Sequence, residues 1–582
     1  MKVKFLAILA GLSLLSMSSC KDFLDAAPDT RVELVTVEQL RELLVTGYMS
    51  YNYAIVGELS SDNVIDNNSP NDEGMRYNLS SYDLGDEELY AWKDVKSNID
   101  GNSPSGVWSG CYHAIATANA VLERVAELEQ DPSGLTDSEL TMLSAVKGEA
   151  LLIRAYHHFI LVNVFCMPYQ GENPVPDYTG KLADYQGIPY MTAPETEVKP
   201  HYDRGTVADD YRMIEADIEA GLPLINDAIY EVPKYHFNRA AANAFAARFY
   251  LFKRDYEKVV KYADAAFNGV DPSEMMSDIW AHRGELYYIR DIGRYYTEMS
   301  RANVFLCFSS YSTWARRAHG YRYQCHREAK RATIEGPGPT WENCKWRNTR
   351  TNEVFSMHPC FNGLCGSAGD AEYGKYFAGI MAEQFEYTDK LAGIGYAHMV
   401  RAEFTAEETL LCRAEAKLFL GDMEGCFADL KIWDDARQKI GEENSGLVEL
   451  TPALIENFYS SKGEGRRWGI MKDIHIDEVC PSDKYHLTEA MMPYMQCIQH
   501  YRRIETIHSG MRWFDIKRYG IGFSRKIGKN GTDRLYFMDP RYAIQIPSEV
   551  ISAGFTVNPR VAAPANDDAA VISSKEIVPV NN

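Results

Sequence analysis

Helical periodicity extends over most of the chain and constrains the fold more than any other feature. In residues 107–128, apolar side chains recur at steps of three and four residues, which places them on one face of an amphipathic helix. Residues 136–166 form a longer pattern that opens with Thr136 and Glu139, the spacing of a capping box. The same periodicity predicts further helices at 206–220, 238–253, 255–268, 405–420, 423–440 and 490–509. We therefore expect a mainly α-helical protein.

Two segments, 246–267 and 414–436, each have the pattern of a helix, a short turn and a second helix. A helix pair of this kind cannot bury its apolar faces alone and needs neighbouring pairs, as in tetratricopeptide arrays. The sequence therefore predicts a tetratricopeptide-like helical repeat scaffold over about 107–268 and 401–440, with insertions between the repeats.

Three segments lack the helical period: 48–106, 167–205 and 269–400. They are rich in Gly, Pro, Asn, Asp and Tyr, which predicts loops with short strands. The last of them is far longer than an ordinary structureless connection, so we expect it to be functional or a subdomain. Long insertions in a repeat scaffold often carry binding.

The N-terminus has the pattern of a secretory signal. Two lysines precede an apolar run within residues 1–15 that is too short to cross a membrane as a helix. Cys20 follows two serines, which resembles a bacterial lipobox, in which the cysteine is acylated and becomes the N-terminus. We expect residues 1–19 to be a lipoprotein signal peptide and Cys20 to carry lipid. An ordinary signal followed by an incidental cysteine is the alternative.

The charge balance and the motifs argue against nucleic-acid binding and against catalysis. With 60 basic and 82 acidic residues, the chain has a formal net charge of −22, which repels polyanions. HExxH and GxSxG motifs are absent. Residues 522–530 nearly match a phosphate-binding loop, but the glycine spacing is wrong and Asn530 replaces Ser or Thr, which predicts a flexible loop. His157 and His158 lie in an apolar helix and are expected to pack in the core. We predict no enzyme and no catalytic residues.

Two stretches contain candidate metal ligands, and neither meets the requirements of a known site. His358, Cys360 and Cys365 lie close together, but the second ligand pair of a closed zinc site is missing. Residues 60–74 are rich in side-chain oxygens, without the spacing and terminal Glu of a helix-loop-helix calcium loop. We predict no metal and no cofactor, with calcium at 60–74 as the open alternative to a solvated loop.

Six segments spread along the chain carry recognisable motifs, namely CKDFLDAAP (20–28), GELSSDNV (57–64), GEALLIRAYHHFILVNVFCMPY (148–169), RAEFTAEETLLCRAEAKLFLGD (401–422), RRIETIHSGMRWFDIKRYG (502–520) and AIQIPSEV (543–550). Together, and in this order, they resemble the SusD/RagB family of outer-membrane nutrient-binding lipoproteins. Each segment is weak alone, and six in order are specific. Cys166 and Ser509 depart from the pattern, since the family often has Gly and Glu there. Residues 280–400 match nothing in the family, whose members vary in this part with their ligand.

The resemblance implies a SusD-like domain over 20–582, with a variable ligand-binding insertion at about 269–400 and the C-terminal segment of the family at 490–560. It also implies a surface-exposed protein, held in the outer membrane by its acylated N-terminus. Such a protein captures oligosaccharide and delivers it to a SusC-like TonB-dependent transporter, without chemistry. Binding of peptide or another nutrient by the same machinery is the alternative, and a surface glycoside hydrolase is the less favoured one.

Aromatic residues gather in the insertion, with thirteen of them in residues 280–346. Sugar rings present C–H faces that stack on flat aromatic rings, while polar side chains bind the hydroxyl groups. The family often places a ligand-stacking aromatic where Trp92 stands, whereas Trp108 is expected in the core. We predict that the ligand surface uses Trp92 and some of Tyr311, Trp314, Trp341 and Trp346.

The insertion is also locally basic. Residues 280–350 contain 13 Lys and Arg against 6 Asp and Glu, and six of the basic residues lie in 314–331. Because arginine pairs in a bidentate manner with carboxylate or sulfate, recognition of an acidic glycan is one interpretation. A solvated face, or an ion-paired seam with the transporter, is the favoured one.

Overall fold

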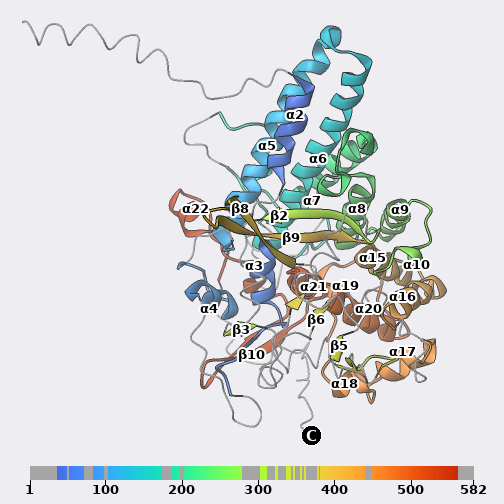
Figure 1. Ribbon diagram of the computed structural model, residues 1–582. Coiled ribbons are helices and arrows are strands. Elements are labelled where there is room, and N and C mark those ends of the chain that lie inside the picture. Colours follow the sequence, from blue (N-terminus) through green and yellow to red (C-terminus); the bar gives the residue numbers. More distant parts are fainter. Residues whose placement is uncertain are drawn as a thin grey trace, which may run out of the picture.

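The structure is a computed structural model, drawn as a ribbon in Figure 1. It describes residues 36–48, 51–70, 83–97, 102–172, 186–196, 202–277, 302–310, 322–324, 336–341, 345–347, 354–356, 360–361, 377–378, 381–438 and 448–560. Cys20 and the expected signal peptide at 1–19 lie outside these ranges.

Helices dominate the described part of the chain. The upper bundle in Figure 1 contains α2 (Val37–Leu44), α5 (Pro104–Gln130), α6 (Asp137–Phe165) and α7 (Val207–Gly221). The adjoining array of helix pairs contains α8 (Arg239–Lys253), α9 (Tyr256–Phe267), α15 (Ala406–Phe419) and α16 (Met423–Gln438), with α15 packed on α9. Below it lie α3 (Tyr53–Ser60), α20 (Met492–Glu505) and α21 (Met511–Tyr519), with α20 packed on α15 and α21 on α3. The prediction of a mainly α-helical repeat scaffold is confirmed.

Shorter helices complete the described part. They are α4 (Leu84–Tyr90), α10 (Pro272–Met275), α17 (Pro452–Phe458), α18 (Glu464–Arg467), α19 (Ile476–Val479) and α22 (Ser548–Ser552). Single 3-10 turns are η1 (Val45–Gly47), η2 (Pro132–Gly134), η4 (Leu222–Leu224), η5 (Asp227–Ile229), η6 (Pro233–Tyr235) and η7 (Pro540–Tyr542). None of the helices within the described ranges is long and apolar enough to cross a membrane.

The strands form small antiparallel sheets. The largest has the order β2 (Val304–Ser310), β9 (Ile394–Thr405), β8 (Met381–Asp389). Two-stranded sheets pair β1 (Ile65–Asp66) with β3 (Tyr323–Gln324), β4 (Lys345–Arg347) with β5 (Val354–Ser356), β6 (Cys360–Phe361) with β7 (Phe377–Ala378), and β10 (Phe523–Ile527) with β11 (Gly531–Leu535). Strand β9 runs past residue 400, where we expected the insertion to end, as far as Thr405, whose side chain caps α15.

Helix α6 is the central helix, and its start follows the expected signal. The Thr136 side chain accepts a hydrogen bond from the backbone N–H of Glu139, and the Glu139 carboxylate accepts one from Thr136, which completes the capping box. From Gly148 onward every residue of the helix is buried, including the polar residues Glu149, Arg154 and Asn163, so the core surrounds this half of the helix on all sides. A Cβ on Gly148 would lie 2.8 Å from the Gly221 carbonyl oxygen, so the glycine permits the close packing of α6 on α7.

Two segments differ from the sequence-based expectation. The 48–106 segment, expected to form loops with short strands, contains the helices α3 and α4. The 522–530 segment, expected to be a flexible loop, lies in the β10–β11 hairpin, with Arg525 buried. Cys111, Cys166, Cys412 and Cys426 are buried free thiols.

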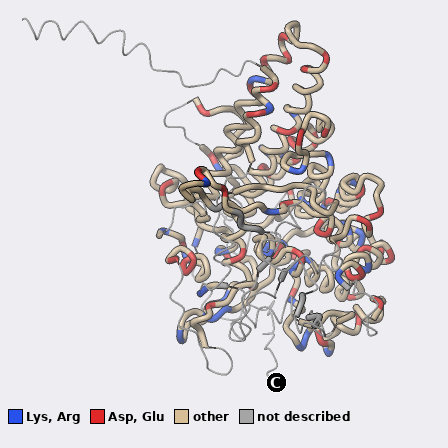
Figure 2. The backbone as a smooth tube through the Cα atoms, viewed as in Figure 1, with Lys and Arg blue, Asp and Glu red and all other residues tan. Residues whose placement is uncertain are grey.

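Basic and acidic residues are interspersed along the described backbone (Figure 2), and several of them meet inside the core. Arg248 of α8 donates through Nε to Glu408 of α15 at 2.9 Å and through Nη1 to Glu403 of β9 at 2.7 Å. Arg401 of β9 lies 2.6 Å from the second Glu403 oxygen and donates to the Tyr53 hydroxyl of α3 at 2.7 Å. This cluster joins α3, α8 and the continuous β9–α15 segment.

A second buried cluster ties the C-terminal helices to the repeat array. Arg502 of α20 and Arg518 of α21 share Asp515, with Nε–Oδ distances of 3.1 and 2.7 Å. Arg518 also donates to both carboxylate oxygens of Glu415 in α15, at 2.5 and 2.8 Å. Because each charge has lost its water, each depends on its partners.

We predict that Arg248→Leu lowers the free energy of unfolding by about 3–5 kcal/mol, since it leaves buried carboxylates short of a partner. Arg212→Leu is the matched control, because Arg212 forms only half-exposed pairs with Asp209 and Glu172; we expect it to cost under about 1 kcal/mol. Urea unfolding followed by circular dichroism measures both. Equal midpoints for the two variants would contradict the prediction.

Candidate functional site

Trp92, the position at which the resemblance implies a ligand-stacking aromatic, lies at the C-terminal end of α4 in a strained backbone conformation. Its φ is 49°, in the left-handed region that is uncommon for a bulky residue. The N–H of Trp92 bonds to the Leu89 carbonyl, and that of Lys93 bonds to the Glu88 carbonyl, which together form a Schellman cap. Glycine is the usual residue at this position, so a tryptophan here must be held by its side-chain contacts.

The Trp92 ring is 5% exposed and is enclosed by several protein groups, among them Arg541, whose guanidinium carbon lies 5.4 Å from the ring centroid. Its Nε1–H donates to the Ser60 carbonyl at 2.9 Å. The Arg525 guanidinium carbon lies 3.9 Å from the ring centroid, and the Phe523 ring meets its edge at 5.3 Å. In this conformation the ring packs against protein groups and offers no open face to a sugar, so ligand stacking at Trp92 stays a prediction.

Arg525 organises this cluster from the β10–β11 hairpin. Its two terminal nitrogens donate to four carbonyls at 2.6–2.8 Å, those of Leu59, Ser60 and Ser61 at the end of α3 and that of Tyr90. These are the carbonyls that a helix end leaves without intrahelical donors, and a cation there also meets the negative end of the helix dipole. Burial lowers the pKa of Arg525 to about 10.

The described part of the basic run lies against the same cluster. Strand β3 pairs with β1, and Arg322 donates to both carboxylate oxygens of Asp66 at 2.7 Å. The Tyr323 ring lies 4.8 Å from the Tyr90 ring, which packs under Arg525 at 4.3 Å. At Arg322, therefore, the basic run forms an ion-paired seam within the chain itself.

The partners of Asp62 and Asp66 bear on the prediction of calcium binding at 60–74. Arg512 binds both carboxylate oxygens of Asp62, at 2.8 and 3.0 Å. Although burial alone would raise the pKa of Asp62, Arg503, Arg512 and Lys472 hold it well below its usual range. Since Asp62 and Asp66 both bind guanidinium groups, the arrangement does not fit calcium at either carboxylate.

The other predicted ligand rings lie elsewhere or outside the described residues. Trp341 is 8% exposed, donates to the Gly336 carbonyl at 3.1 Å and stacks on Tyr501 of α20 at 5.9 Å. It therefore contacts different elements from Trp92. Trp346 lies in β4, and its side chain is outside the described residues, as are Tyr311 and Trp314 entirely. The ligand role of these four rings stays a prediction, as does the lipid on Cys20.

Of the candidate zinc ligands, one lies within the described residues, and Trp108 lies in the core. Cys360 lies in β6, whereas His358 and Cys365 lie outside the described residues. Trp108 packs edge-on against Phe165 at 5.1 Å in the core, as predicted.

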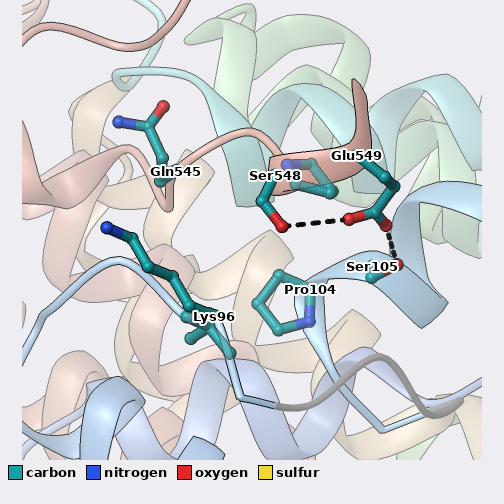
Figure 3. A pocket seen from close by; sticks show the side chains of 8 residues that line it. Lys96, Pro104, Ser105, Gln545, Ser548 and Glu549 are labelled. Carbon is teal, nitrogen blue, oxygen red and sulfur yellow. Dashed lines mark hydrogen bonds between the residues drawn. The ribbon is translucent and has the colours of Figure 1, made fainter. Parts of the chain in front are cut away.

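A shallow hollow that opens to solvent lies where the start of α5 meets α22 (Figure 3). The hydroxyls of Ser105 and Ser548 both donate to the Glu549 carboxylate. The Gln545 amide donates to the Asn558 carbonyl at 3.2 Å, so these lining groups bind protein partners. Among the side chains drawn in Figure 3, the Lys96 amine extends beside the hollow. Because its polar lining is already engaged, the hollow does not resemble a glycan site.

Comparisons with known proteins agree with this architecture. A family model described as starch-binding and associating with the outer membrane matches residues 22–251. A SusD superfamily protein of Bacteroides thetaiotaomicron, 18% identical, has a TM-score of 0.52 over 90% of this chain and 100% of its own. The chain has the fold of SusD superfamily proteins. A SusD superfamily protein of Bacteroides vulgatus, 16% identical, has a TM-score of 0.54 over 91% of this chain and 100% of its own. No curated protein resembles the chain closely enough to count as a match.

The sequence-based expectations did not include Arg525. The alternation of Phe523, Arg525 and Ile527 is a strand pattern that points all three side chains to one face. That signal was present, but the two glycines of the segment favoured the interpretation as a loop.

We predict that Arg525→Gln releases the Trp92 ring, because an amide cannot supply the donors that four carbonyls share. The measurement is fluorine NMR of protein labelled with 5-fluorotryptophan, with the Trp92 resonance assigned by its loss in Trp92→Phe. The Trp92 resonance should shift and become sensitive to solvent. The control is Lys529→Gln, an exposed change in the same hairpin. A Trp92 resonance unmoved by Arg525→Gln would show that the hairpin does not hold the ring.

Proposed function

We propose that this protein is a cell-surface lipoprotein that captures oligosaccharide and delivers it to a SusC-like TonB-dependent transporter. The observation that carries the proposal is the match of residues 22–251 to a family described as starch-binding and associating with the outer membrane. The lipobox-like Cys20 and the aromatic-rich insertion support it from the sequence. In this proposal the acylated N-terminus anchors the protein, and the loops of the insertion contact the ligand.

Binding without turnover is the second part of the proposal. Among the described residues, burial lowers the pKa values of His157 and His158 to about 3. Both side chains are buried in α6 and bonded to protein groups, which suits packing rather than proton transfer. Capture of peptide by the same machinery is the competing function, and the aromatic content of the insertion favours sugar. A surface hydrolase is the least favoured candidate.

We predict that the mature chain binds at least one member of a panel of starch, laminarin, xylan and pectin, and releases no product from it. Within that complex, Trp314→Ala or Trp346→Ala should weaken binding about tenfold if the ring stacks on sugar, by analogy with base stacking. Isothermal titration calorimetry gives the affinity, and reducing-end analysis gives the turnover.

The controls separate the alternatives. Binding of pectin that weakens as salt rises would indicate ion pairing with the basic run, whereas stacking on a neutral glycan should be insensitive to salt. Binding of a peptide library without any glycan binding would replace sugar by peptide. Steady product formation that a single carboxylate substitution abolishes would overturn the assignment as a binder.

We predict that Cys20→Ala leaves the precursor unprocessed or releases the protein from the membrane fraction. Several acyl chains bind lipid far more firmly than one, since each buried CH₂ contributes about 0.8 kcal/mol. Cell fractionation and the intact mass of the N-terminal peptide measure the effect, with Ser19→Ala as the neighbouring control. An unchanged mass in Cys20→Ala would show that the cysteine is incidental.

A further inference from the structure

Glu58 of α3 is a fully buried carboxyl whose hydrogen bonds come from neutral donors. Its Oε1 accepts from the side-chain amide of Asn63 and from the backbone N–H of His508, both at 3.0 Å. Among the described residues, no group donates to Oε2 with ordinary hydrogen-bond geometry. The buried carboxylates of Asp62 and Glu415 differ, because guanidinium groups bind them directly.

The His508 N–H belongs to a tight turn that joins α20 to α21. His508 has a φ of 64° and Gly510 a φ of 82°, both in the left-handed region. A histidine is uncommon there, so the surrounding contacts must hold the turn in place. Among these contacts are the Glu58 carboxyl and Arg401 of β9, which donates to the Ser509 carbonyl at 3.2 Å. Glu58 thus binds the turn at its strained residue.

Helix α3 lies directly on this turn, with backbone against backbone. A Cβ on Gly57 would lie 2.4 Å from the Gly510 carbonyl oxygen, and a Cβ on Gly510 would lie 2.7 Å from the Ala54 Cα. The carboxyl of the next residue, Glu58, is bonded to the same turn. Because a close-packed interior transmits strain, a displacement of the turn must also displace α3.

Arg503 of α20 is a cation that favours the ionised form of Glu58. Its Nε donates to the Asn63 side-chain oxygen at 2.9 Å and its Nη2 to the Asp62 carbonyl at 2.8 Å, so it acts on Glu58 through space. The other titratable group of the turn is the His508 imidazole. Further charged and titratable groups around α3 bind other partners; they are Arg512 and Lys472 with Asp62, Arg401 and Arg248 with Glu403, Arg525 with backbone carbonyls, Arg322 with Glu87, Tyr51 with Cys111 and His157, and Tyr90 with the Lys526 carbonyl.

Burial outweighs these favourable contacts and raises the pKa of Glu58 to about 7. The N–H donors, with that of Gly510 close by but outside ordinary bonding geometry, and Arg503 act in the opposite direction. In the unfolded chain the same carboxyl has its ordinary pKa of 4.5. Between these two values the folded protein holds a proton that the unfolded chain has released. The contribution of Glu58 to stability is therefore fully present below about pH 4.5 and is lost as the pH rises through about 7.

We propose that Glu58 is a pH-sensitive latch that holds α3 on the turn between α20 and α21, firm while its carboxyl is protonated and weaker once the carboxyl is ionised. The latch is connected to Trp92, because the carbonyls of Leu59 and Ser60, the next residues of α3, bind Arg525. The Arg525 guanidinium in turn packs on the Trp92 ring. A shift of α3 as Glu58 ionises should therefore reach Trp92. This inference is independent of the proposed function, since it concerns only how α3 is held.

The test compares Glu58→Gln with the wild type by hydrogen exchange of residues 54–62, measured by mass spectrometry in the full mature chain. The amide keeps the size of the side chain and an acceptor for the His508 N–H, but it cannot ionise. From about pH 5 to 7, the opening equilibrium of the wild type relative to that of the variant should rise roughly five- to tenfold per pH unit, because opening releases one proton. The ratio should level off above about pH 8. Ser61→Ala is the matched control, since it removes a buried hydroxyl that donates to the Glu58 carbonyl and carries no titratable group; its ratio to the wild type should not change with pH.

Each outcome decides the question. A constant ratio of wild type to Glu58→Gln over the whole pH range, with the variant folded, overturns the latch. In protein labelled with 5-fluorotryptophan, the Trp92 resonance should move over the same range in the wild type and stay fixed in Glu58→Gln; a shift that persists in the variant overturns the link to Trp92. If Glu58→Gln does not fold, the wild type alone decides: opening of 54–62 that rises with pH more steeply than opening of 150–162 in α6 supports the latch, and an equal pH dependence overturns it.

Discussion

Buried arginine–carboxylate pairs are the constraint on which the rest of this structure depends. A desolvated charge is stable only when its partner is in place, so segments that carry the two partners must fold together. Glu408 and Glu415 lie seven residues apart on one face of α15 and receive Arg248 from α8 and Arg518 from α21. Helix α15 is therefore the element on which the early repeats and the C-terminal segment meet. The pairs need not add net stability relative to apolar residues at the same positions. Loss of one partner is nevertheless costly, because it leaves the other charge buried and unpaired.

The same logic extends from the core to the surface features. Arg512 of α21 binds Asp62, directly after α3, and Arg525 of the following hairpin binds the carbonyls at the end of α3. The C-terminal segment thus binds the end of α3 through the Asp62 carboxylate and through backbone carbonyls. The same Arg525 also packs on the Trp92 ring and fixes its position. Strand β9 places Arg401 and Glu403 in the core, and its partner β8 carries the exposed Phe385. Strand β9 is thus anchored in the core by its charged side chains.

The helices of the repeats were predictable because their signals are local, and Thr136 with Glu139 shows this well. Helix α3 was not, since all its residues from Tyr53 to Ser60 are buried and leave no periodic contrast between faces. The open or closed state of an aromatic ring is a tertiary property. Trp341 lies in a loop rich in Gly and Pro, which suggests exposure, yet it stacks on Tyr501 from a helix far along the chain. No pattern within the loop could have revealed that contact.

The strongly perturbed pKa values around α6 have a structural cause. Strongly shifted pKa values often mark catalytic groups, but structural burial shifts them as well. Burial lowers the pKa of His157 to about 3; its Nε2 donates to the Gly47 carbonyl, so its Nδ1 accepts from the Tyr51 hydroxyl and both nitrogens are engaged. Burial likewise lowers the pKa of Lys517 to about 7, and its amine donates to the carbonyls of Asn163 and Cys166 at 2.6 Å, closing the end of α6. His157 and Lys517 are thus bonded to protein atoms around α6, and their perturbed pKa values follow from their place in its packing.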